Sequence, residues 1–388
     1  MKRHLSAHSV ESSNVGVKST HENIPTIFGT GLIALDIILS AYPNRSPILA
    51  AGGTCGNVLT GLSFLGWDAF PIARLSADVA SETVSSDLNQ WGVDLEFARQ
   101  TPSAPTPIIL QRNDRGRDGK PRHRYSVACP ACGAWYPSFR AVTTDGAESV
   151  IEAVEDASHS GFAPQVFFFD RVSRGALLLA NSFAERGALV VFEPIGIGDP
   201  KLFSEALSLA HIVKYSDERI DAAAVSPPVK NRMLLEVQTL GQEGLRYRFA
   251  KNSRAVWEHL ESVSAAVVMD TAGAGDWLTA AFLSLVANSG IEGFLELTRT
   301  DLRDALRFGQ GAASSACEHE GARGVMSALN RVEFHARIAS LLSGNTIPAS
   351  DAVTAEIQAP SSGSHARVSS RHADPRPDLE ALCPTCPC

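Results

Sequence analysis

The sequence predicts an α/β protein with a central, mostly parallel sheet, helices on both faces and a small β lid. Two observations carry this prediction. Short apolar runs bounded by turn residues alternate with stretches that place apolar residues at helical spacing. The short runs are apolar almost without interruption, as expected of strands buried on both faces of a parallel sheet. In such sheets, ligands bind beyond the carboxyl ends of the strands.

Four of the short runs are expected to be strands, at residues 166–169, 189–192, 212–214 and 234–237. The segments LLLANSFAERG and PKLFSEALSLA separate the first three, and their apolar residues recur at helical spacing. This alternation is the β-α-β pattern of a parallel sheet covered by helices.

Residues 101–144 interrupt the pattern. They contain an extended run, PTPIILQRN, then a charged turn, DRGRDGKPRHR, and then a second run that begins at Tyr125. Two extended runs joined by such a turn predict a hairpin. Because this hairpin falls outside the alternating pattern, we expect it to form the small lid.

The two ends of the chain differ in composition from the rest. Residues 1–24 are polar and without periodicity, so we expect a flexible N-terminal arm. Residues 343–388 are rich in Ser, Pro, Ala and His, which predicts a flexible C-terminal tail ending in a cluster of cysteines. The folded domain is therefore expected at residues 25–342, with the lid inserted at about residues 101–144.

Charge and hydropathy argue against several classes of partner. Lys and Arg total 34 against 42 Asp and Glu, a net charge of −8 that disfavours nonspecific binding to nucleic acid or anionic membranes. The longest apolar run, WLTAAFLSLVA, is shorter than the ~20 residues that a membrane span needs. We therefore expect a buried helix there. The first residues lack the apolar core of a secretory signal, so a cytoplasmic protein is expected.

The motif DTAGAGD occupies residues 270–276, directly before this apolar helix. Gly273 and Gly275 permit a tight turn, so that several N–H groups and the positive end of the helix dipole converge on an anion site. Asp276 falls in the first helical turn, where a carboxylate could accept a hydroxyl proton while the amides stabilise a transferring phosphoryl group. The alternative is an N-cap aspartate after a glycine turn, without any chemistry.

DTAGAGD resembles the DTxGAGD motif of the PfkB, or ribokinase-like, carbohydrate kinases. Three further segments support the resemblance in the family's order. AGGTCGN at residues 51–57, continuing to Leu65-Gly66, is similar to the family's GGxxxNxAxxLxxLG. HIVKYSDER at 211–219 resembles its VKxSDEE, and TLGQEG at 239–244 resembles its nucleotide loop, TLGxxG. The similarity extends from about residue 27 to residue 323.

The resemblance implies an ATP-dependent kinase that uses Mg²⁺ and phosphorylates a hydroxyl of a sugar or sugar-like molecule. It implies that Asp276 is the catalytic base. It places the anion hole at Ala272, Gly273, Ala274 and Gly275, the substrate contacts at Asp36, Gly52, Gly53 and Asn57, and the ATP contacts at Thr239, Gly241 and Gly244. Asp36 would end the family's opening strand, and Asp270 matches a position associated with a monovalent cation such as K⁺.

Three departures from the family pattern leave the substrate open. Ala34 stands where relatives often have an Asn, and Arg219 stands where a magnesium-associated Glu is expected. Glu193-Pro194-Ile195 replaces an Asp-Pro-Asn stretch. Two alternatives to a sugar kinase follow: a nucleoside kinase of the same fold, and a catalytically inactive scaffold or sensor that depends on zinc.

Two CxxC pairs, Cys129/Cys132 and Cys383/Cys386, have the form in which two thiolates grip one face of a tetrahedral zinc ion. Four thiolates would close the site, so the zinc would be structural. The pairs are far apart in sequence and would have to be joined by the fold, by the flexible tail or by another subunit, as in a homodimer. The alternatives are a redox-active dithiol and a tail that binds nothing.

Overall fold

The computed structural model describes residues 24–42, 45–101, 103–117, 121–159, 162–226, 228, 230–249, 256–344 and 382–383. The expected N-terminal arm lies outside the described residues except for Ile24. Of the expected C-terminal tail, only Ser343, Gly344, Leu382 and Cys383 are described.

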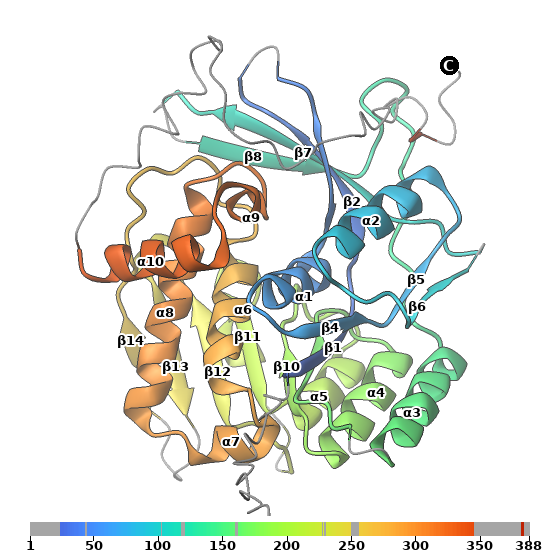
Figure 1. Cartoon of the computed structure of the whole chain (residues 1–388), viewed down its shortest axis with the longest axis vertical. Coiled ribbons are helices and arrows are strands. Elements are labelled where there is room, and N and C mark those ends of the chain that lie inside the picture. Colours follow the sequence, from blue (N-terminus) through green and yellow to red (C-terminus); the bar gives the residue numbers. More distant parts are fainter. Residues whose placement is uncertain are drawn as a thin grey trace, which may run out of the picture.

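An eight-stranded sheet forms the main body, in the order β14-β13-β12-β11-β10-β9-β1-β4 (Figure 1). Neighbouring strands from β4 to β12 are parallel, and β13 and β14 add an antiparallel edge. The strands are β1 Thr26–Thr30, β4 Asp68–Pro71, β9 Val166–Phe169, β10 Leu189–Phe192, β11 Ile212–Ser216, β12 Leu235–Thr239, β13 Leu245–Phe249 and β14 Glu258–Leu260. The mostly parallel sheet is thus as predicted. Two of the four expected strands have the expected bounds, β11 ends two residues later, and β12 begins one residue later and ends two residues later than expected.

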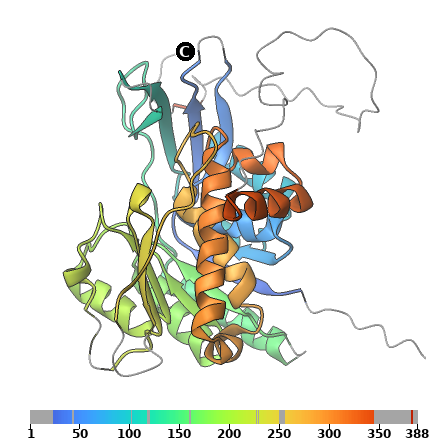
Figure 2. The ribbon, with the colours of Figure 1, turned by 90° about the vertical axis from the view of Figure 1, so that its left-hand side faces the viewer.

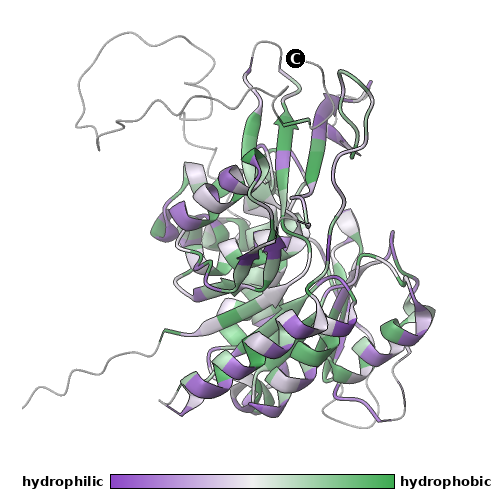
Figure 3. Ribbon diagram, turned by 90° about the vertical axis from the view of Figure 1, so that its right-hand side faces the viewer, coloured by the Kyte–Doolittle hydropathy of each residue, from purple (hydrophilic) through white to green (hydrophobic). Residues whose placement is uncertain are grey.

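Successive side chains of the main strands enter two separate hydrophobic clusters, one on each face of the sheet. In β9, Val166 and Phe168 belong to the cluster that includes residues of α1, α6 and α8. Phe167 and Phe169 belong to the cluster that includes residues of α3, α4 and α5. These helices are α1 Thr54–Phe64, α6 Ala274–Val286, α8 Arg299–Cys317, α3 Thr144–Ser158, α4 Arg174–Glu185 and α5 Pro200–Leu209. Figure 3 shows hydrophobic and hydrophilic residues alternating along the covering helices, which are amphipathic.

A second sheet, of four strands, stands above the main sheet and is the lid (Figures 1 and 2). Its order is β3-β2-β7-β8, with β3 Ile48–Gly52, β2 Ala34–Leu39, β7 Ile108–Arg115 and β8 Pro121–Ser126. The hairpin expected at residues 101–144 is therefore present as β7 and β8. The lid also takes β2 and β3 from the N-terminal part of the chain, which the sequence did not indicate.

The position expected for Asp36 needs a correction. The opening strand of the main sheet is β1, and Asp36 lies within β2 of the lid, opposite Ala50 on one side and Ile109 on the other. Gly31, with φ of 150°, and Leu32 lie between the two strands, and Leu32 N–H is held by the Asp170 carboxylate. The chain therefore leaves the main sheet before Asp36, which is carried into the lid.

Two smaller groups of elements complete the fold. β5 Ala73–Leu75 and β6 Ala98–Gln100 form a parallel pair beside α2 Val79–Gln90. The remaining helices are η1 Ala222–Ala224, η2 Gly241–Glu243, α7 Gly290–Glu296, α9 Gly324–Ala328 and α10 Arg331–Leu342. Among the described residues no one helix has the length and hydropathy to cross a bilayer; α6 and α7 meet that criterion only as a pair bent by 82°.

The helices begin in two ways, and the difference points to the site. Six long helices have an N-cap side chain that accepts a hydrogen bond from the first turn: Asp78, Thr143, Ser173, Asp199, Thr298 and Asn330. α1 and α6 begin instead after Gly53 and Gly273, which have φ of 82° and 74° and offer no side-chain cap. The N–H groups of a first turn have no partner inside the helix, so these two ends can receive a ligand, except at Gly56 and Ala274, whose N–H groups donate to Leu32 O and Thr271 O.

Candidate active site

The candidate site lies at the carboxyl edge of the main sheet, where the chain order reverses. β1 has β9 on one side and β4 on the other, so the crevice beyond β1 and β9 is the position where ligands bind in sheets of this kind. Asp170 follows β9 there and accepts the Leu32 N–H at 2.9 Å and an Arg171 Nη1–H at 2.6 Å. The negative charge of Asp170 is thus neutralised by Arg171.

The DTAGAGD segment builds the first turn of α6 at this edge. A Cβ on Gly273 would lie 2.6 Å from Ala322 Cβ, and φ is positive, so only glycine fits. Ala272 N–H donates to Asp270 at 2.9 Å, and Ala274 N–H donates to Thr271 O at 3.3 Å. The predicted hole of Ala272, Gly273, Ala274 and Gly275 therefore occupies a helix N-terminus without a side-chain cap, although the Ala272 and Ala274 amides are already used.

Asp276 lies in this first turn and is held by α1. Asn57 Nδ2 donates to Asp276 Oδ2 at 2.7 Å, a contact between residues 219 positions apart in the chain. Burial, and then the nearby Glu193 carboxylate, raises the pKa of Asp276 to about 7, although the Asn57 hydrogen bond and Lys214 act in the opposite direction. A carboxylate with a pKa near neutrality is well matched to accept a proton.

A buried ion pair lies directly beneath Gly275. Lys214, from β11, donates to Glu193, which follows β10. A Cβ on Gly275 would lie only 3.5 Å from Lys214 Nζ, which places this ammonium next to the open helix end. Thr279, one turn further along α6, donates to Glu193 Oε2 at 2.7 Å and fixes the carboxylate. Lys214 and Glu193 both lie in segments that the sequence analysis compared with the family, but neither was predicted to be a site residue.

On the lid side, Asp36 packs against the glycine turn before α1. A Cβ on Gly52 would lie 1.9 Å from Asp36 Oδ2, and one on Gly53 would lie 2.4 Å from Leu32 O, so both positions require glycine. Burial raises the pKa of Asp36 to about 7, opposed by the Arg323 guanidinium and by the Gly53 N–H. The predicted substrate contacts Asp36, Gly52, Gly53 and Asn57 are therefore adjacent in space.

Three polar atoms around this point are buried without a hydrogen-bond partner. Of the five such side-chain atoms among the described residues, three belong here: Asp36 Oδ1, Asn57 Oδ1 and Arg323 Nη1. Arg323 directs its other Nη to Asp87, whose Oδ2 also accepts the Ala51 N–H at 2.8 Å. Leaving a buried polar group without a partner costs about 1–3 kcal/mol. The cluster is therefore suited to a ligand that bears hydroxyl groups.

Asp270 is held by five donors. Its Oδ2 accepts from Gln111 Nε2 at 2.7 Å, Asn113 Nδ2 at 3.1 Å and Gly321 N at 3.0 Å. Its Oδ1 accepts from Ala272 N and lies 3.3 Å from His123 Nδ1. The His123 hydrogen bond and these backbone donors hold the pKa of Asp270 below its usual range, although burial acts against them.

A carboxylate offers about four lone-pair positions, which these donors fill. The Asp270 side chain therefore does not fit a direct ligand of a monovalent cation. It instead connects lid strands β7 and β8 to the turn before α6.

The predicted ATP contacts lie at the ends of β12 and β13. Thr239 ends β12, its carbonyl accepts the Asp217 N–H at 3.1 Å, and Gly241 and Gly244 follow with φ of 57° and 96°. A Cβ on Gly244 would lie 2.1 Å from Leu260 O. The loop thus follows β12, whose carboxyl end lies at the same edge of the main sheet as Glu193, which follows β10.

Lid strand β8 adds two aromatic rings. His123 and Tyr125 lie with centroids 4.9 Å apart, and Tyr125 is 54% exposed. Although the side chain is 54% exposed, protein atoms around the phenol raise the pKa of Tyr125, and the charges of Asp270, Asp36 and Asp276 add to the rise. Tyr125 therefore lies close to the candidate site. Arg219 acts on the same phenol in the opposite direction, so it too is nearby.

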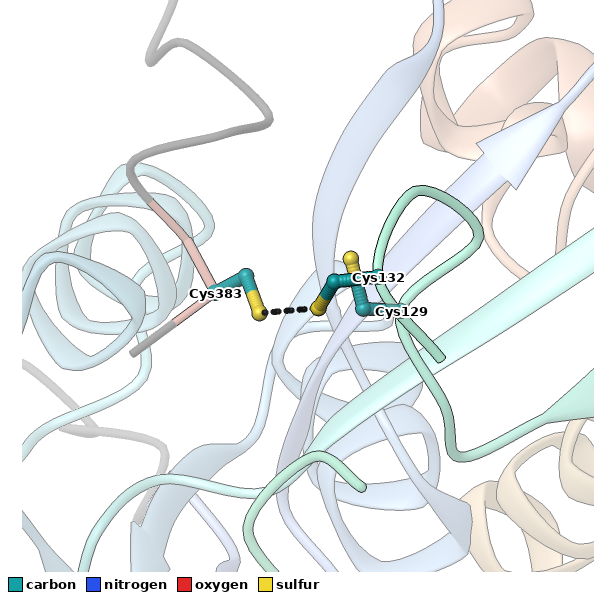
Figure 4. A group of neighbouring side chains, drawn as sticks. All are labelled: Cys129, Cys132 and Cys383. Atoms are coloured by element: carbon teal, nitrogen blue, oxygen red, sulfur yellow. Dashed lines mark hydrogen bonds between the residues drawn. The ribbon is translucent and has the colours of Figure 1, made fainter. Parts of the chain in front are cut away.

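The predicted metal ligands form a separate group. Cys129, Cys132 and Cys383 lie together, with their sulfur atoms within 4.8 Å of one another (Figure 4). Cys386 lies outside the described residues. Of the other described cysteines, Cys55 is buried in the core and Cys317 is half-buried.

Sequence and structure comparisons agree with this geometry. A family model described as pfkB family carbohydrate kinase matches residues 175–329. The matched segment runs from α4 to α9 and contains the DTAGAGD turn, Lys214 and the nucleotide loop. No curated protein matches the sequence.

Solved structures of pfkB-like kinases share the fold at low sequence identity. A fructokinase from Xylella fastidiosa with bound ATP has a TM-score of 0.60 at 19% identity, covering 83% of this chain and 99% of its own. A Burkholderia thailandensis nucleoside kinase in complex with inosine has a TM-score of 0.58 at 19% identity, covering 82% and 98%. An Arabidopsis thaliana ribokinase complexed with ribose and ATP has a TM-score of 0.56 at 18% identity, covering 82% and 99%. The predicted fold is confirmed, and the matching family model is that of the family whose motifs the sequence resembles.

Proposed function

We propose that this protein transfers the γ-phosphoryl group of ATP to a hydroxyl of a sugar or sugar-like small molecule. One observation carries the proposal. A carboxylate with a pKa near neutrality, Asp276, lies in the open first turn of α6 and is oriented by Asn57. An acceptor hydroxyl next to Asp276 would thus meet a proton acceptor and an anion-binding helix end at the same point.

The acceptor would be bound between the lid and α1. Asp36 Oδ1 and Asn57 Oδ1 would accept hydrogen bonds from its hydroxyls, and Arg323 Nη1 would donate to one of its oxygens. Each of these atoms is buried and without a partner, so a polyol would satisfy groups that an apolar ligand would leave unsatisfied.

Asp276 would take the proton of the attacking hydroxyl, and Asn57 would hold the carboxylate toward it. Charge on the transferring group would be stabilised by the N–H groups at the start of α6 and by Lys214 beneath Gly275. Thr239, Gly241 and Gly244 would line the ATP. Glu193 serves to position Lys214 and, through Thr279, to join it to α6.

Mg²⁺ would neutralise phosphate charge as ATP·Mg²⁺. This ion keeps several waters and is usually held through nucleotide phosphates. The chain fits that arrangement, since the carboxylates of Asp170 and Glu193 are each already paired with a cationic side chain. The monovalent cation predicted at Asp270 is a different case. Because that carboxylate is filled by protein donors, we propose no step through such an ion.

A nucleoside acceptor is the second candidate, and Tyr125 is the observation that favours it. Its exposed ring on β8 lies close to the carboxylates of the site and could stack on a base. The same cluster of Asp36, Asn57 and Arg323 would then bind the ribose. A cytoplasmic location and a homodimer stay predictions.

The proposal is tested by ATP consumption against a panel of sugars and nucleosides. A preceding thermal-shift screen would select acceptors, because a ligand that binds only the native state raises its melting temperature. Turnover that requires an acceptor hydroxyl supports a kinase, and a preference for nucleosides that Tyr125→Ala removes would select the second candidate. ATP binding with no turnover on any acceptor would support the inactive scaffold instead.

A further inference from the structure

The loop after β8 is shaped to present two thiols on one side. Cys129 O accepts the Gly133 N–H at 2.9 Å, and Cys129 N donates to Ala134 O at 2.8 Å. Gly133 has φ of 74°, which a residue with a side chain rarely adopts. The backbone N–H groups of Cys132 and Ala131 donate to the Cys129 sulfur. The loop is thus a tight turn that holds both thiols on one side.

The C-terminal segment brings a third thiol to this turn. Cys383 Sγ lies 3.6 Å from Cys132 Sγ, and all three sulfurs lie within 4.8 Å of one another (Figure 4). A tetrahedral zinc ion with Zn–S bonds of ~2.3 Å would separate its ligands by ~3.8 Å. The spacing between Cys132 and Cys383 is therefore that of two ligands of one ion.

We propose that Cys129, Cys132 and Cys383 bind one zinc ion. Cys386, which the sequence also predicts as a ligand, lies outside the described residues. Thiolate ligands select zinc over the oxygen-preferring Mg²⁺ and Ca²⁺. Bound by thiolates of the lid loop and of the C-terminal segment, the ion would have a structural role.

The surroundings support a metal over a disulfide. The three sulfurs form one group, whereas a disulfide would join two of them and leave the third. The Tyr136 hydroxyl is hydrogen-bonded to the Cys129 sulfur, an outer contact of the type that orients metal ligands. Leu382 and Cys383 are buried in the same hydrophobic cluster as Cys129 and Tyr136, so the tail is seated on the lid loop before any ion is considered.

The ion would join two distant parts of the chain. The turn at Cys129 follows lid strand β8, which carries His123 and Tyr125, whereas Cys383 belongs to a segment that follows α10 after residues 345–381. Binding zinc would release the thiol protons and fasten the C-terminal segment to the lid. This inference does not depend on the kinase proposal, because its readout is metal content.

The test measures metal in the full-length protein, purified without a metal-affinity tag. We expect about one zinc per chain by elemental analysis, and far less than one in Cys129→Ser and Cys383→Ser. Cys317→Ser, a half-buried thiol outside the cluster, is the matched control and should keep its zinc.

A second measurement avoids variants that fail to fold. Titrating wild-type thiols with a mercurial, in the presence of a chromophoric chelator, should release the zinc stoichiometrically, and cobalt-reconstituted wild type should show thiolate-to-metal charge-transfer bands. Wild type without zinc and without those bands would overturn the proposal. So would a disulfide between Cys132 and Cys383 in protein prepared under reducing conditions.

Discussion

The two sheets of this protein use the same secondary structure for different ends. In the main sheet, all eight side chains of β9 and β10 are apolar and buried, and they alternate between the two hydrophobic clusters. In the lid, strands β2, β7 and β8 carry Asp36, Gln111, Asn113, His123 and Tyr125, polar groups that converge on Asp270 and the α1 turn.

This difference suggests that apolar strands of the main sheet provide stability, whereas the lid provides polar groups for ligand binding. Strands β9 and β10 bury only apolar side chains and so hold Asp170 and Glu193, which follow them, in fixed positions. The lid contributes less apolar burial and depends on hydrogen bonds to the main body, chiefly through Asp270. Breaking a lid contact should therefore alter acceptor binding, whereas breaking the α6 turn should abolish transfer.

The largest effect should come from the main body. Asp276→Asn removes the proton acceptor but keeps the shape of the first turn, so turnover should fall by about 10² to 10⁴-fold. ATP affinity should change little, because the open helix end remains. Steady-state kinetics with nucleotide-binding measurements check this, and Asp304→Asn, an exposed acid on α8, is the control. Near wild-type turnover in Asp276→Asn would show that Asp276 is not the catalytic base.

The lid counterpart is Asp36→Asn, which removes the carboxylate charge and replaces an acceptor with a donor. A hydrogen bond to a charged group contributes about 1.5–3 kcal/mol, so kcat/KM for the acceptor should fall by about 10- to 100-fold. The KM for ATP should be unchanged. Asp114→Asn, whose carboxylate on β7 pairs with Arg124, is the matched control in the same sheet. An equal loss of ATP affinity would place Asp36 outside the acceptor site.

The pH dependence should report the buried carboxylate of α6. Because the pKa of Asp276 is raised to about 7, the residue is protonated at lower pH and cannot accept a proton there. The kcat/KM for the acceptor should rise with pH, level off above an apparent pKa near 7, and fall about tenfold per unit well below it.

The pKa of Asp36 is also raised to about 7, so Asp36 could produce the same rise of kcat/KM with pH. The rising limb should therefore persist in Asp36→Asn and disappear with the residual activity of Asp276→Asn. A rate that stays flat from pH 5 to pH 8 would contradict the raised pKa.

The smallest effect concerns the contact between the two sheets. Since five protein donors fill Asp270, replacing K⁺ with Na⁺ at constant ionic strength should change turnover by less than about twofold. Initial rates in matched chloride salts measure this. Activation by K⁺ well beyond twofold would restore the cation prediction for Asp270 and would show that the lid contacts open during turnover.

Much of the main sheet could be predicted from local pattern. The runs at residues 166–169 and 189–192 are apolar throughout. Four apolar residues between turn signals are typical of a strand that is buried on both faces of a parallel sheet. The DTAGAGD turn could also be predicted, since Gly273 and Gly275 precede an apolar helix and imply an open helix N-terminus. The lid hairpin was visible because its charged turn interrupts the alternation.

The membership of the lid was not visible. β2 follows β1 after only three residues, so the sequence read as one opening strand ending at Asp36. The direction in which a strand leaves a sheet depends on a turn at Gly31 and Leu32 and on its hydrogen bond to Asp170, a residue 138 positions away. Arg323 was missed for the same reason, since a lone arginine among small residues carries no local signal.

The sequence by itself therefore determined several strands of the main sheet, the lid hairpin and the glycine turns, and it indicated Asp276 as the candidate base, because these follow from side-chain periodicity and backbone freedom at neighbouring positions. The tertiary structure alone decided which donors meet Asp270, that Asn57 orients Asp276, that Lys214 lies beneath Gly275, and that Cys383 reaches Cys132. Each of these contacts joins residues brought together by packing of the sheets and helices. Their energies depend on burial and distance, which no local stretch of sequence contains.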